Sequence, residues 1–535
     1  MPTSTAGYFD AAAGLPIHPV ALEALQMAAE DGWADPTKLT GPGRRSAVLL
    51  DAARETVAGI FAVRADEVIF VPSGTHALQL AVLGTLVGRA RAGNRLVHSA
   101  VEHSSVLKAA EWYSTQRSDD PSSLIDIVGV DSFGRVDAAD FVAVARRPGV
   151  AAAVLQAANH EVGTRQPVAD VAAGLSESGV PLVVDATHDL IYGDPPLGAA
   201  VFTADARMWG GPPGVGVLVV RRGTRWVSPF PADEAESRRS AGVVSVPAAL
   251  AAAAALRAFH EDRDGHATRL RLLIDQIRDG VTHLDGGVNA TVAGVGGHEL
   301  IVLGDPRDRL PHLMTFSTMY VDGEALLTAL DREGFVVSSG SSCTSDTLTP
   351  SHVLVAMGAL SSGNVRISLH PEVSQTDVDR FLAVLPRVLG ALRAELPVSG
   401  PIEVASTPKS PSTDPLSTHP RSVDPVPADP VADASDGILV DSRGRRCPLP
   451  ILDLARAWPA LPVGGDITVL SDDPAAETDI EAWARMQGQE YLGSTPHRGG
   501  PTGESNGGES NGDESSTRAV PEAPVATAYR LRRRS

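Results

Sequence analysis

Short apolar runs alternate with longer Ala- and Leu-rich runs over residues 1 to about 398. The short runs are almost continuously apolar, which is typical of strands buried on both faces of a sheet. Five such runs are predicted strands: Glu67–Val71, Arg95–Ser99, Ala152–Gln156, Pro181–Asp185 and Val215–Val220. Their alternation with helical runs predicts an α/β fold with a mainly parallel sheet flanked by helices.

The pattern divides this region into a large part, about 15–245, and a smaller one, about 250–398. From about residue 250 a long helix is followed by predicted strands around Leu313–Tyr320 and Gly334–Ser338. This arrangement predicts a second, smaller α+β lobe.

A different composition begins after residue 398. Residues 399–435 hold eight prolines and no helical period, which predicts an extended, semi-rigid linker. Residues 436–535 then resume a strand–loop–helix pattern twice, which predicts a small α+β two-layer domain. Within it, the Gly/Ser/Glu-rich stretch 498–517 is predicted to be disordered, and the alternating stretch ATAYRLRR is predicted to return as an edge strand.

Charge and cysteine content exclude several classes of partner and binding site. The 535 residues include 45 Lys and Arg against 65 Asp and Glu, a net charge of −20, which argues against nucleic acid or an anionic membrane as the main partner. The two cysteines, Cys343 and Cys447, are too few for a disulfide framework or a four-thiolate zinc site, and no metal site is predicted. The apolar stretch Val243–Leu256 is too short to span a bilayer and predicts a buried helix. With no secretory signal visible, we expect a soluble cytoplasmic protein with reduced thiols.

Candidate chemistry follows the ends of the predicted strands. Ser73–Ala77 opens a helix after a strand, where it forms either a phosphate seat with Gly74 and Thr75 or a plain helix cap. His103 stands at a helix start, either to stack on a flat ring or as an ordinary surface histidine. Asp185 ends an apolar strand, as a partner for a protonated ring nitrogen or as a helix cap. Cys343 lies in a Ser/Gly-rich loop, which favours an exposed thiol over a buried inert one.

Cys447 has its own local signal. It precedes Pro-Leu-Pro at a predicted helix start and follows Arg443, Arg445 and Arg446. Helix-end N–H groups and neighbouring arginines both favour a thiolate. The alternative is a chance cysteine beside a proline turn.

The order of the motifs is more specific than any one of them. In sequence they are YFDAAAG, SGTHA, EH, NHEVGT, VVDATH, GGPPGVGVL, SSGSSC, PSHVLVAMG and NVRISL. Over about residues 7–395 the chain resembles the cysteine desulfurases, fold-type-I enzymes of pyridoxal phosphate related to class V aminotransferases. Residues 437–497, with VDSRGRRCPLPILDLARA and DDPAAETDIEAWARMQG, resemble the TusA-like sulfur carriers.

The resemblance implies roles for individual residues. Cys343 would be the nucleophile that takes sulfur from L-cysteine as a persulfide, and Cys447 would be the persulfide-carrying cysteine of the second domain. His103 would stack on the cofactor ring, and His103 or His188 could act as a base. The implied cofactor-binding residues are Gly74, Thr75, His103, Asp185, His188 and Arg207, and the implied substrate-binding residues are Arg366 and Asn159.

Several positions depart from the desulfurase pattern. His160 stands where the family has an asparagine, His188 where it has a glutamine, and Arg207 where it has a histidine. Met208 stands where the family has the lysine that binds pyridoxal phosphate covalently, and Asp205 stands where it has a phosphate-binding serine. The only lysines in the chain are Lys38, Lys108 and Lys409. Without the lysine, covalent attachment is lost, and so is a resident base, whose contribution is typically ~10²–10⁴-fold in rate.

Three functions are compatible with these residues. The first is a cysteine desulfurase that releases alanine and passes sulfur from Cys343 to Cys447 and on to a downstream acceptor protein. The second is a non-catalytic sulfur relay or scaffold that has lost cofactor chemistry. The third is a selenocysteine lyase. The resemblance also implies a homodimer, whereas the identity of the final sulfur acceptor stays open.

Overall fold

The structure is a computed structural model that describes residues 5–285, 299–340, 350–395, 437–497 and 526–534. The chain divides into two compact units, residues 1–288 with 299–394, and residues 289–298 with 395–535. The predicted linker 399–435, the stretch 498–517 and Cys343 lie outside the described residues.

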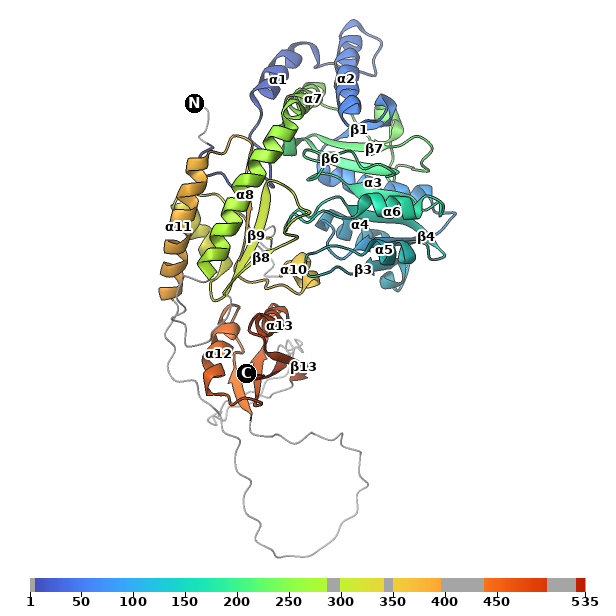
Figure 1. Cartoon of the computed structure of the whole chain (residues 1–535). Helices are drawn as coiled ribbons and strands as arrows, with labels where there is room; N and C mark the ends of the chain where they lie inside the picture. Colours follow the sequence, from blue (N-terminus) through green and yellow to red (C-terminus); the bar gives the residue numbers. More distant parts are fainter. Residues whose placement is uncertain (1–4, 286–298, 341–349, 396–436, 498–525, 535) are drawn as a thin grey trace, which may run out of the picture. The chain divides into compact units, whose positions relative to one another are not determined.

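The first unit is built on a seven-stranded sheet with the order β1-β7-β6-β5-β4-β2-β3 (Figure 1). Its strands are β1 (Val68–Val71), β2 (Arg95–Ser99), β3 (Ile125–Val128), β4 (Val150–Gln156), β5 (Leu182–Asp185), β6 (Val201–Asp205) and β7 (Gly216–Val220). The neighbours from β3 to β6 are parallel, whereas β7 pairs antiparallel with both β6 and β1. The predicted mainly parallel sheet is therefore confirmed, and β1 runs in the same direction as β6.

Helices cover both faces of this sheet, as its continuously apolar strands predict. In β1, Ile69 and Val71 pack in one hydrophobic cluster with α3 and α4, whereas Val68 and Phe70 pack in another that includes α5 and α6. The helices of the large part are α1 (Pro19–Asp31), α2 (Gly41–Ile60), α3 (Gly74–Gly88), α4 (Ser104–Thr115), α5 (Ala138–Ala145), α6 (Val168–Leu175) and α7 (Val246–Glu261). Short 3₁₀ helices are η1 (Ala65–Glu67), η2 (Pro121–Leu124), η3 (Ala206–Trp209) and η4 (Ala235–Arg238).

Helix α7 contains most of the apolar stretch Val243–Leu256, which the sequence predicts to be a buried helix. It packs against α1, α2 and η3, and Ala249, Ala251 and Ala255 are fully buried. The predicted buried helix is thus confirmed. Across the described ranges, every helix falls short of the length and apolar composition needed to cross a bilayer.

A smaller lobe completes the first unit with a three-stranded antiparallel sheet in the order β10-β9-β8. Its elements are α8 (Arg263–Asp285), β8 (Leu300–Leu303), β9 (Leu313–Thr318), α9 (Gly323–Arg332), α10 (His352–Met357), β10 (Asn364–Ser368) and α11 (Gln375–Ala394). The predicted strand at Gly334–Ser338 is wrong. Val336 bridges Tyr8 and Ser338 bridges Arg366, so this segment pairs with two different partners and forms no continuous ladder.

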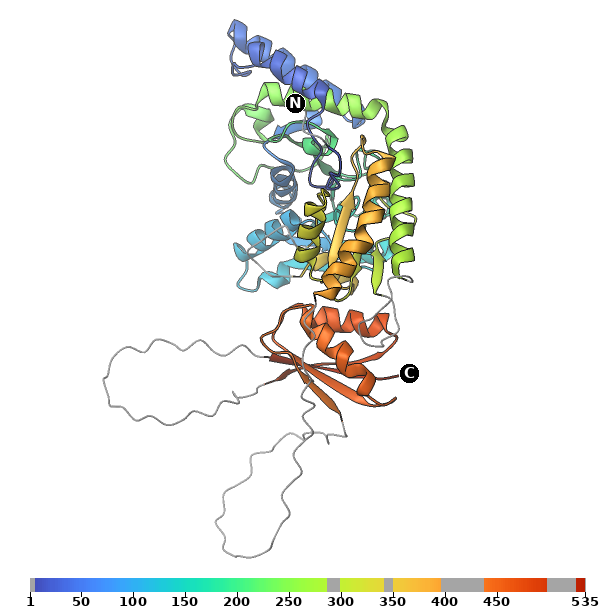
Figure 2. The same cartoon turned by 90° about the vertical axis from the view of Figure 1, so that its left-hand side faces the viewer.

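The second unit is a four-stranded sheet in the order β11-β12-β14-β13, with two helices packed against it (Figure 2). Its elements are β11 (Ile438–Asp441), α12 (Leu449–Ala457), η5 (Trp458–Ala460), β12 (Asp466–Ser471), α13 (Ala476–Met486), β13 (Glu490–His497) and β14 (Ala526–Arg532). The edge position predicted for the last strand is wrong, because β14 pairs with β12 on one side and β13 on the other.

Candidate functional site

The first unit holds a cavity of about 250 Å³ at the carboxyl ends of its strands. Because β1 and β6 run in the same direction as β2, β4 and β5, the loops after all five strands meet at one edge of the sheet. The lining includes seven of the predicted site residues: Gly74, Thr75, His103, Asp185, His188, Arg207 and Arg366. Ala12, Ala13, His160, Asp205 and Met208 also line it.

Asp205 engages the helix end that we predicted as a phosphate seat. The backbone N–H of Gly74, the first residue of α3, donates a hydrogen bond of 3.1 Å to Asp205 Oδ2. The carboxylate is also an ion-pair partner of Arg207, with Nη2 at 3.1 Å from Oδ2. Ser73 caps the same helix by accepting a hydrogen bond from the N–H of His76. Two of the backbone donors that would receive a phosphate, the N–H groups of Gly74 and His76, therefore already have acceptors.

Met208 occupies the position of the family's lysine. It lies in η3, lines the cavity and is only 4% exposed. Of the lysines that the structure describes, Lys38 is paired with Asp35 and Lys108 with Glu111 at the surface, and neither lines the cavity. Lys409 lies outside the described residues.

These side chains do not fit pyridoxal phosphate as the family binds it. A thioether cannot replace the amine, and a buried carboxylate faces the place where the cofactor's phosphate would lie. The cofactor that the resemblance implies is therefore not supported by the residues lining this cavity, although Thr75, His103 and Asp185 stand where the motifs predict them.

Arg366, the predicted clamp for a substrate carboxylate, already holds a carboxylate of this chain. Its Nη2 donates to Asp10 Oδ1 at 2.9 Å and to Ser338 Oγ at 3.2 Å, and its Nη1 donates to the carbonyl of His160 at 3.1 Å. Its Nε is buried without a hydrogen-bond partner in the described structure. A substrate carboxylate at Arg366 would have to compete with Asp10.

Three imidazoles line the cavity in a row. The ring centroids of His103 and His160 are 5.0 Å apart, and those of His160 and His188 are 6.2 Å apart. Burial holds the pKa of His160 and of His188 well below the ordinary value, and the neighbouring imidazoles lower both further. Both rings are therefore neutral at pH 7, and His188 is a weak base. His103 also caps α4, since its Nδ1 accepts the N–H of Ser105 at 3.2 Å.

Asn159 is the other residue for which the resemblance implies substrate binding. It is absent from the cavity lining and fully buried. Its amide donates to the carbonyl of Val101 at 3.1 Å and accepts the N–H groups of Glu161 and Val162, each at 2.9 Å. Asn159 therefore shapes the loop after β4, and its neighbour His160 faces the cavity instead.

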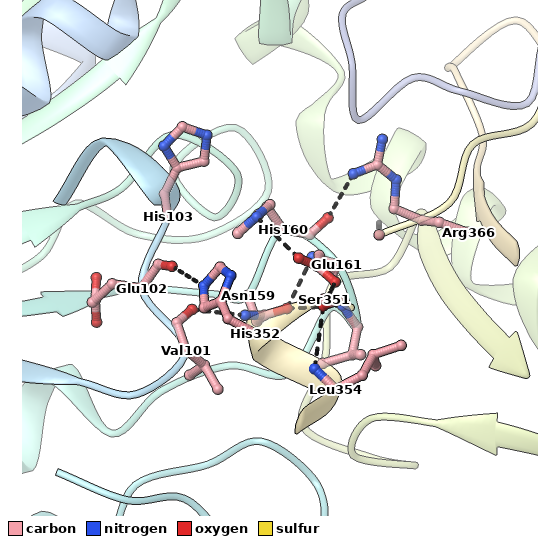
Figure 3. A network of polar contacts seen from close by, with 12 residues as sticks. Val101, Glu102, His103, Asn159, His160, Glu161, Ser351, His352, Leu354 and Arg366 are labelled. Carbon is pink, nitrogen blue, oxygen red and sulfur yellow. Dashed lines mark hydrogen bonds and ion pairs between the residues drawn. The ribbon is translucent and has the colours of Figure 1, made fainter. Parts of the chain in front are cut away.

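Two buried carboxyl groups lie beside this loop (Figure 3). Burial raises the pKa of Glu161 to about 7, and Ser351 donates a hydrogen bond of 2.5 Å to it. Burial likewise raises the pKa of Glu102 to about 8, and its backbone carbonyl is 2.8 Å from His352 Nε2. Gly340 and Ser351 lie on either side of the segment 341–349, which contains Cys343. A Cβ added at Gly340 would clash with Glu161 Oε2, so the backbone there passes close to this carboxyl group.

Sequence reasoning missed the contribution of Asp10 and His160 to the site. Asp10 lies in the first motif, YFDAAAG, but pairs with a residue 356 positions later. His160 was visible only as a departure from the expected asparagine. No local signal in the sequence connects either residue to Arg366.

Cys447 lies in the second unit just before α12. It is half-buried, and its backbone N–H donates a hydrogen bond of 2.5 Å to Asp473 Oδ2. Burial raises the pKa of its thiol, and the nearby carboxylates of Asp479 and Asp473 raise it further. The predicted stabilisation of a thiolate is therefore wrong in this structure.

The neighbouring arginines do not offset this rise in the thiol pKa, because each of them is paired with a carboxylate. Arg443 pairs with Asp441 at 2.6 Å, and Arg445 pairs with Asp453 at 2.7 Å. Arg446 lies 3.9 Å from Asp473. The positive charge that the sequence places near Cys447 is thus largely neutralised.

Comparison with known proteins agrees with both resemblances. The class V aminotransferase family matches residues 7–381, and the family described as Sulfurtransferase TusA matches residues 438–501. An IscS-like cysteine desulfurase of Mycobacterium tuberculosis is 33% identical over 406 residues, which cover 74% of this chain and 99% of that protein. A cysteine desulfurase of Gluconacetobacter diazotrophicus is 32% identical over 401 residues, covering 73% of this chain and 95% of that protein.

Solved structures show the same fold. A NifS-like protein superimposes with a TM-score of 0.63 at 22% identity and covers 72% of this chain and 99% of its own. DndA from Streptomyces lividans is 26% identical with a TM-score of 0.54, covering 68% of this chain and 99% of its own. The chain therefore belongs to the class V aminotransferase family, with cysteine desulfurases as relatives, and carries a TusA sulfurtransferase domain, a combination that supports a role in sulfur transfer.

Proposed function

We propose that this chain is a sulfur relay that receives persulfide sulfur on Cys343 and passes it to Cys447. The proposal rests on two residues of one cavity that differ from those of the cysteine desulfurases. Met208 replaces the cofactor lysine, and the Asp205 carboxylate engages the helix end that would bind the cofactor phosphate. Family membership implies pyridoxal phosphate, but these two residues argue against its use here.

The relay requires two balanced thiol exchanges and no net oxidation. The Cys343 thiolate attacks the terminal sulfur of a donor persulfide, a new S–S bond forms on Cys343, and the donor leaves as a thiolate. Cys447 then attacks the same terminal sulfur, the bond to Cys343 breaks, and Cys343 leaves as a thiolate. Cys447 now holds the sulfur for a downstream acceptor protein.

The surroundings of Cys447 keep the reactivity of its thiol low. Burial and two carboxylates keep its thiol protonated, which slows reaction with adventitious electrophiles. When Cys447 attacks, it must lose its proton, and the neighbouring carboxylates of Asp473 and Asp479 make that loss harder. The carboxylates therefore restrain the reactivity of Cys447.

We further propose that residues 1–398 and 436–535 act as two domains joined by 399–435. A tether of about 37 residues keeps the second cysteine at a high effective concentration near the first. A homodimer is also part of this proposal. Exposed apolar side chains around α1 and the start of α2 support a self-association surface: Met27 is 70% exposed, Trp33 69% and Leu39 88%.

An active cysteine desulfurase is the second candidate. It is favoured by the gathering of Thr75, His103, Asp185 and Arg366 around one cavity, where the desulfurase motifs predict them. In this case L-cysteine would be the sulfur source and alanine the product.

Two measurements on the purified full-length chain separate the candidates. First, L-cysteine is supplied with and without pyridoxal phosphate, and alanine is quantified. Second, a persulfide donor is supplied, thiols are alkylated, and the Cys343 and Cys447 peptides are weighed by mass spectrometry. The relay predicts no alanine and an added sulfur on both cysteines. Alanine formation that Cys343→Ser abolishes would establish the enzyme instead.

A further inference from the structure

The Asp205 carboxylate accepts hydrogen bonds from backbone N–H groups at the starts of two helices, α3 and η3. Its Oδ2 accepts the N–H of Gly74 at the start of α3, at 3.1 Å. Its Oδ1 accepts the N–H of Arg207 in the first turn of η3, at 2.9 Å, and the Arg207 Nε at 3.2 Å. One carboxylate therefore satisfies amide donors of two separate elements and pairs with a guanidinium.

The fit of this carboxylate against α3 is close. A Cβ added at Gly74 would lie 2.7 Å from both Cβ and Oδ2 of Asp205, so the first residue of α3 must lack a side chain. Asp205 is only 4% exposed. Helix N-termini attract anions because their N–H groups lack intrahelical acceptors, and a fixed carboxylate meets that need as a bound phosphate does.

We propose that Asp205 is a built-in replacement for the phosphate of a phosphorylated cofactor, and that it closes this cavity to pyridoxal phosphate. The replacement deepens the proposed relay function and rests on it, since a relay needs the fold of the unit but not the cofactor. Asp205 supplies the negative charge that holds α3 and η3 together, and Met208 removes the covalent anchor.

Electrostatics give the size of the effect. Two like charges about 4 Å apart at an effective dielectric constant near 20 repel by an amount equivalent to roughly 1,000-fold in affinity. Arg207 offsets part of this repulsion, because it is 3.1 Å from the carboxylate, although its side chain is 48% exposed. We therefore expect removal of the Asp205 charge to increase the affinity for phosphate at α3 by about 100-fold.

The first test uses inorganic phosphate and the melting temperature of the full-length chain. Wild type, Asp205→Ser and Asp205→Asn are compared in phosphate and in chloride at equal ionic strength. Asp137→Ser is the matched control, because Asp137 caps α5 at the surface by accepting the N–H groups of Ala139 and Asp140. Binding to the folded state raises the melting temperature, so the expected result is stabilisation by phosphate in the Asp205 variants only.

The second test asks whether the cavity regains its cofactor. Met208→Lys alone and Met208→Lys with Asp205→Ser are incubated with pyridoxal phosphate and treated with borohydride, and the introduced amine is examined by mass spectrometry. The double variant should be labelled at concentrations about 100-fold lower than the single variant.

Two results would overturn the proposal. One is equal labelling of Met208→Lys with and without Asp205→Ser. The other is phosphate stabilisation of the wild type equal to that of both Asp205 variants. Asp205→Asn keeps the size of the side chain, so a folding defect in Asp205→Ser does not remove the test. Neither readout involves sulfur transfer, so this proposal and the relay can fail separately.

Discussion

Replacing Glu102 with glutamine should stabilise the first unit increasingly as the pH rises. Glu102 Oε1 accepts hydrogen bonds from Ser99 Oγ at 2.5 Å and from the N–H of Gln156 at 3.1 Å. Its Oε2 is buried without a hydrogen-bond partner in the described structure. Glutamine keeps the accepting oxygen and removes the buried charge.

The magnitude follows from the pKa of this carboxyl. Burial raises the pKa of Glu102 from 4.5 to about 8, and the nearby charge of Asp185 adds to the rise. Between these two values the folded state keeps a proton that the unfolded chain has released, so stability falls as pH rises through this window. Each tenfold change in proton affinity is worth about 1.4 kcal/mol, so the buried carboxylate costs the folded state about 5 kcal/mol above pH 8.

Calorimetric melting of the wild type and Glu102→Gln at pH 5 and at pH 8 measures this effect. The difference between the two proteins should be small at pH 5 and should grow by roughly 5 °C at pH 8. Glu111→Gln is the control, because Glu111 is an exposed glutamate on α4 and should show no such growth. A Glu102→Gln difference that is the same at both pH values would refute the reasoning.

Three further variants test the packing and charge of both units. Asp479→Asn should speed alkylation of Cys447 by iodoacetamide at pH 8, because one of the carboxylates that raise the thiol pKa is removed. An unchanged rate on the Cys447 peptide would contradict this. Trp209→Ala should destabilise the first unit by about 3–5 kcal/mol, since this side chain is fully buried and donates a 2.9 Å hydrogen bond to α7. A neutral effect in calorimetry would show that the packing is misassigned. Arg54→Met should cost about 3–5 kcal/mol, because it leaves the buried Glu236 carboxylate without two hydrogen bonds of 2.9 and 3.0 Å. Glu236→Gln in the same chain should recover part of that loss.

The gathering of the cavity residues could be predicted from the sequence because it depends on strand direction alone. Gly74, His103 and Asp185 each follow an apolar run, and parallel strands bring such positions to one edge. What the sequence could not reveal was the contact between Asp205 and Gly74. That contact depends on β7 lying between β1 and β6, an order that no local pattern records.

Long-range pairing limited the other predictions in the same way. The alternation in ATAYRLRR predicts a strand correctly, but its central place between β12 and β13 depends on two distant partners. Near Cys447, the three arginines suggest a thiolate, whereas the structure brings in Asp473 and Asp479 from the segment after β12. Local charge was therefore a poor guide to the chemistry of that thiol.

Sulfur movement between the two cysteines is the central claim, and a time course with an isotope-labelled persulfide donor tests it most directly. Samples are alkylated at intervals, and the peptides of Cys343 and Cys447 are weighed by mass spectrometry. The relay predicts that labelled sulfur appears first on Cys343 and then on Cys447, and that Cys343→Ser leaves Cys447 unlabelled. Equal and equally fast labelling of Cys447 in Cys343→Ser would contradict it.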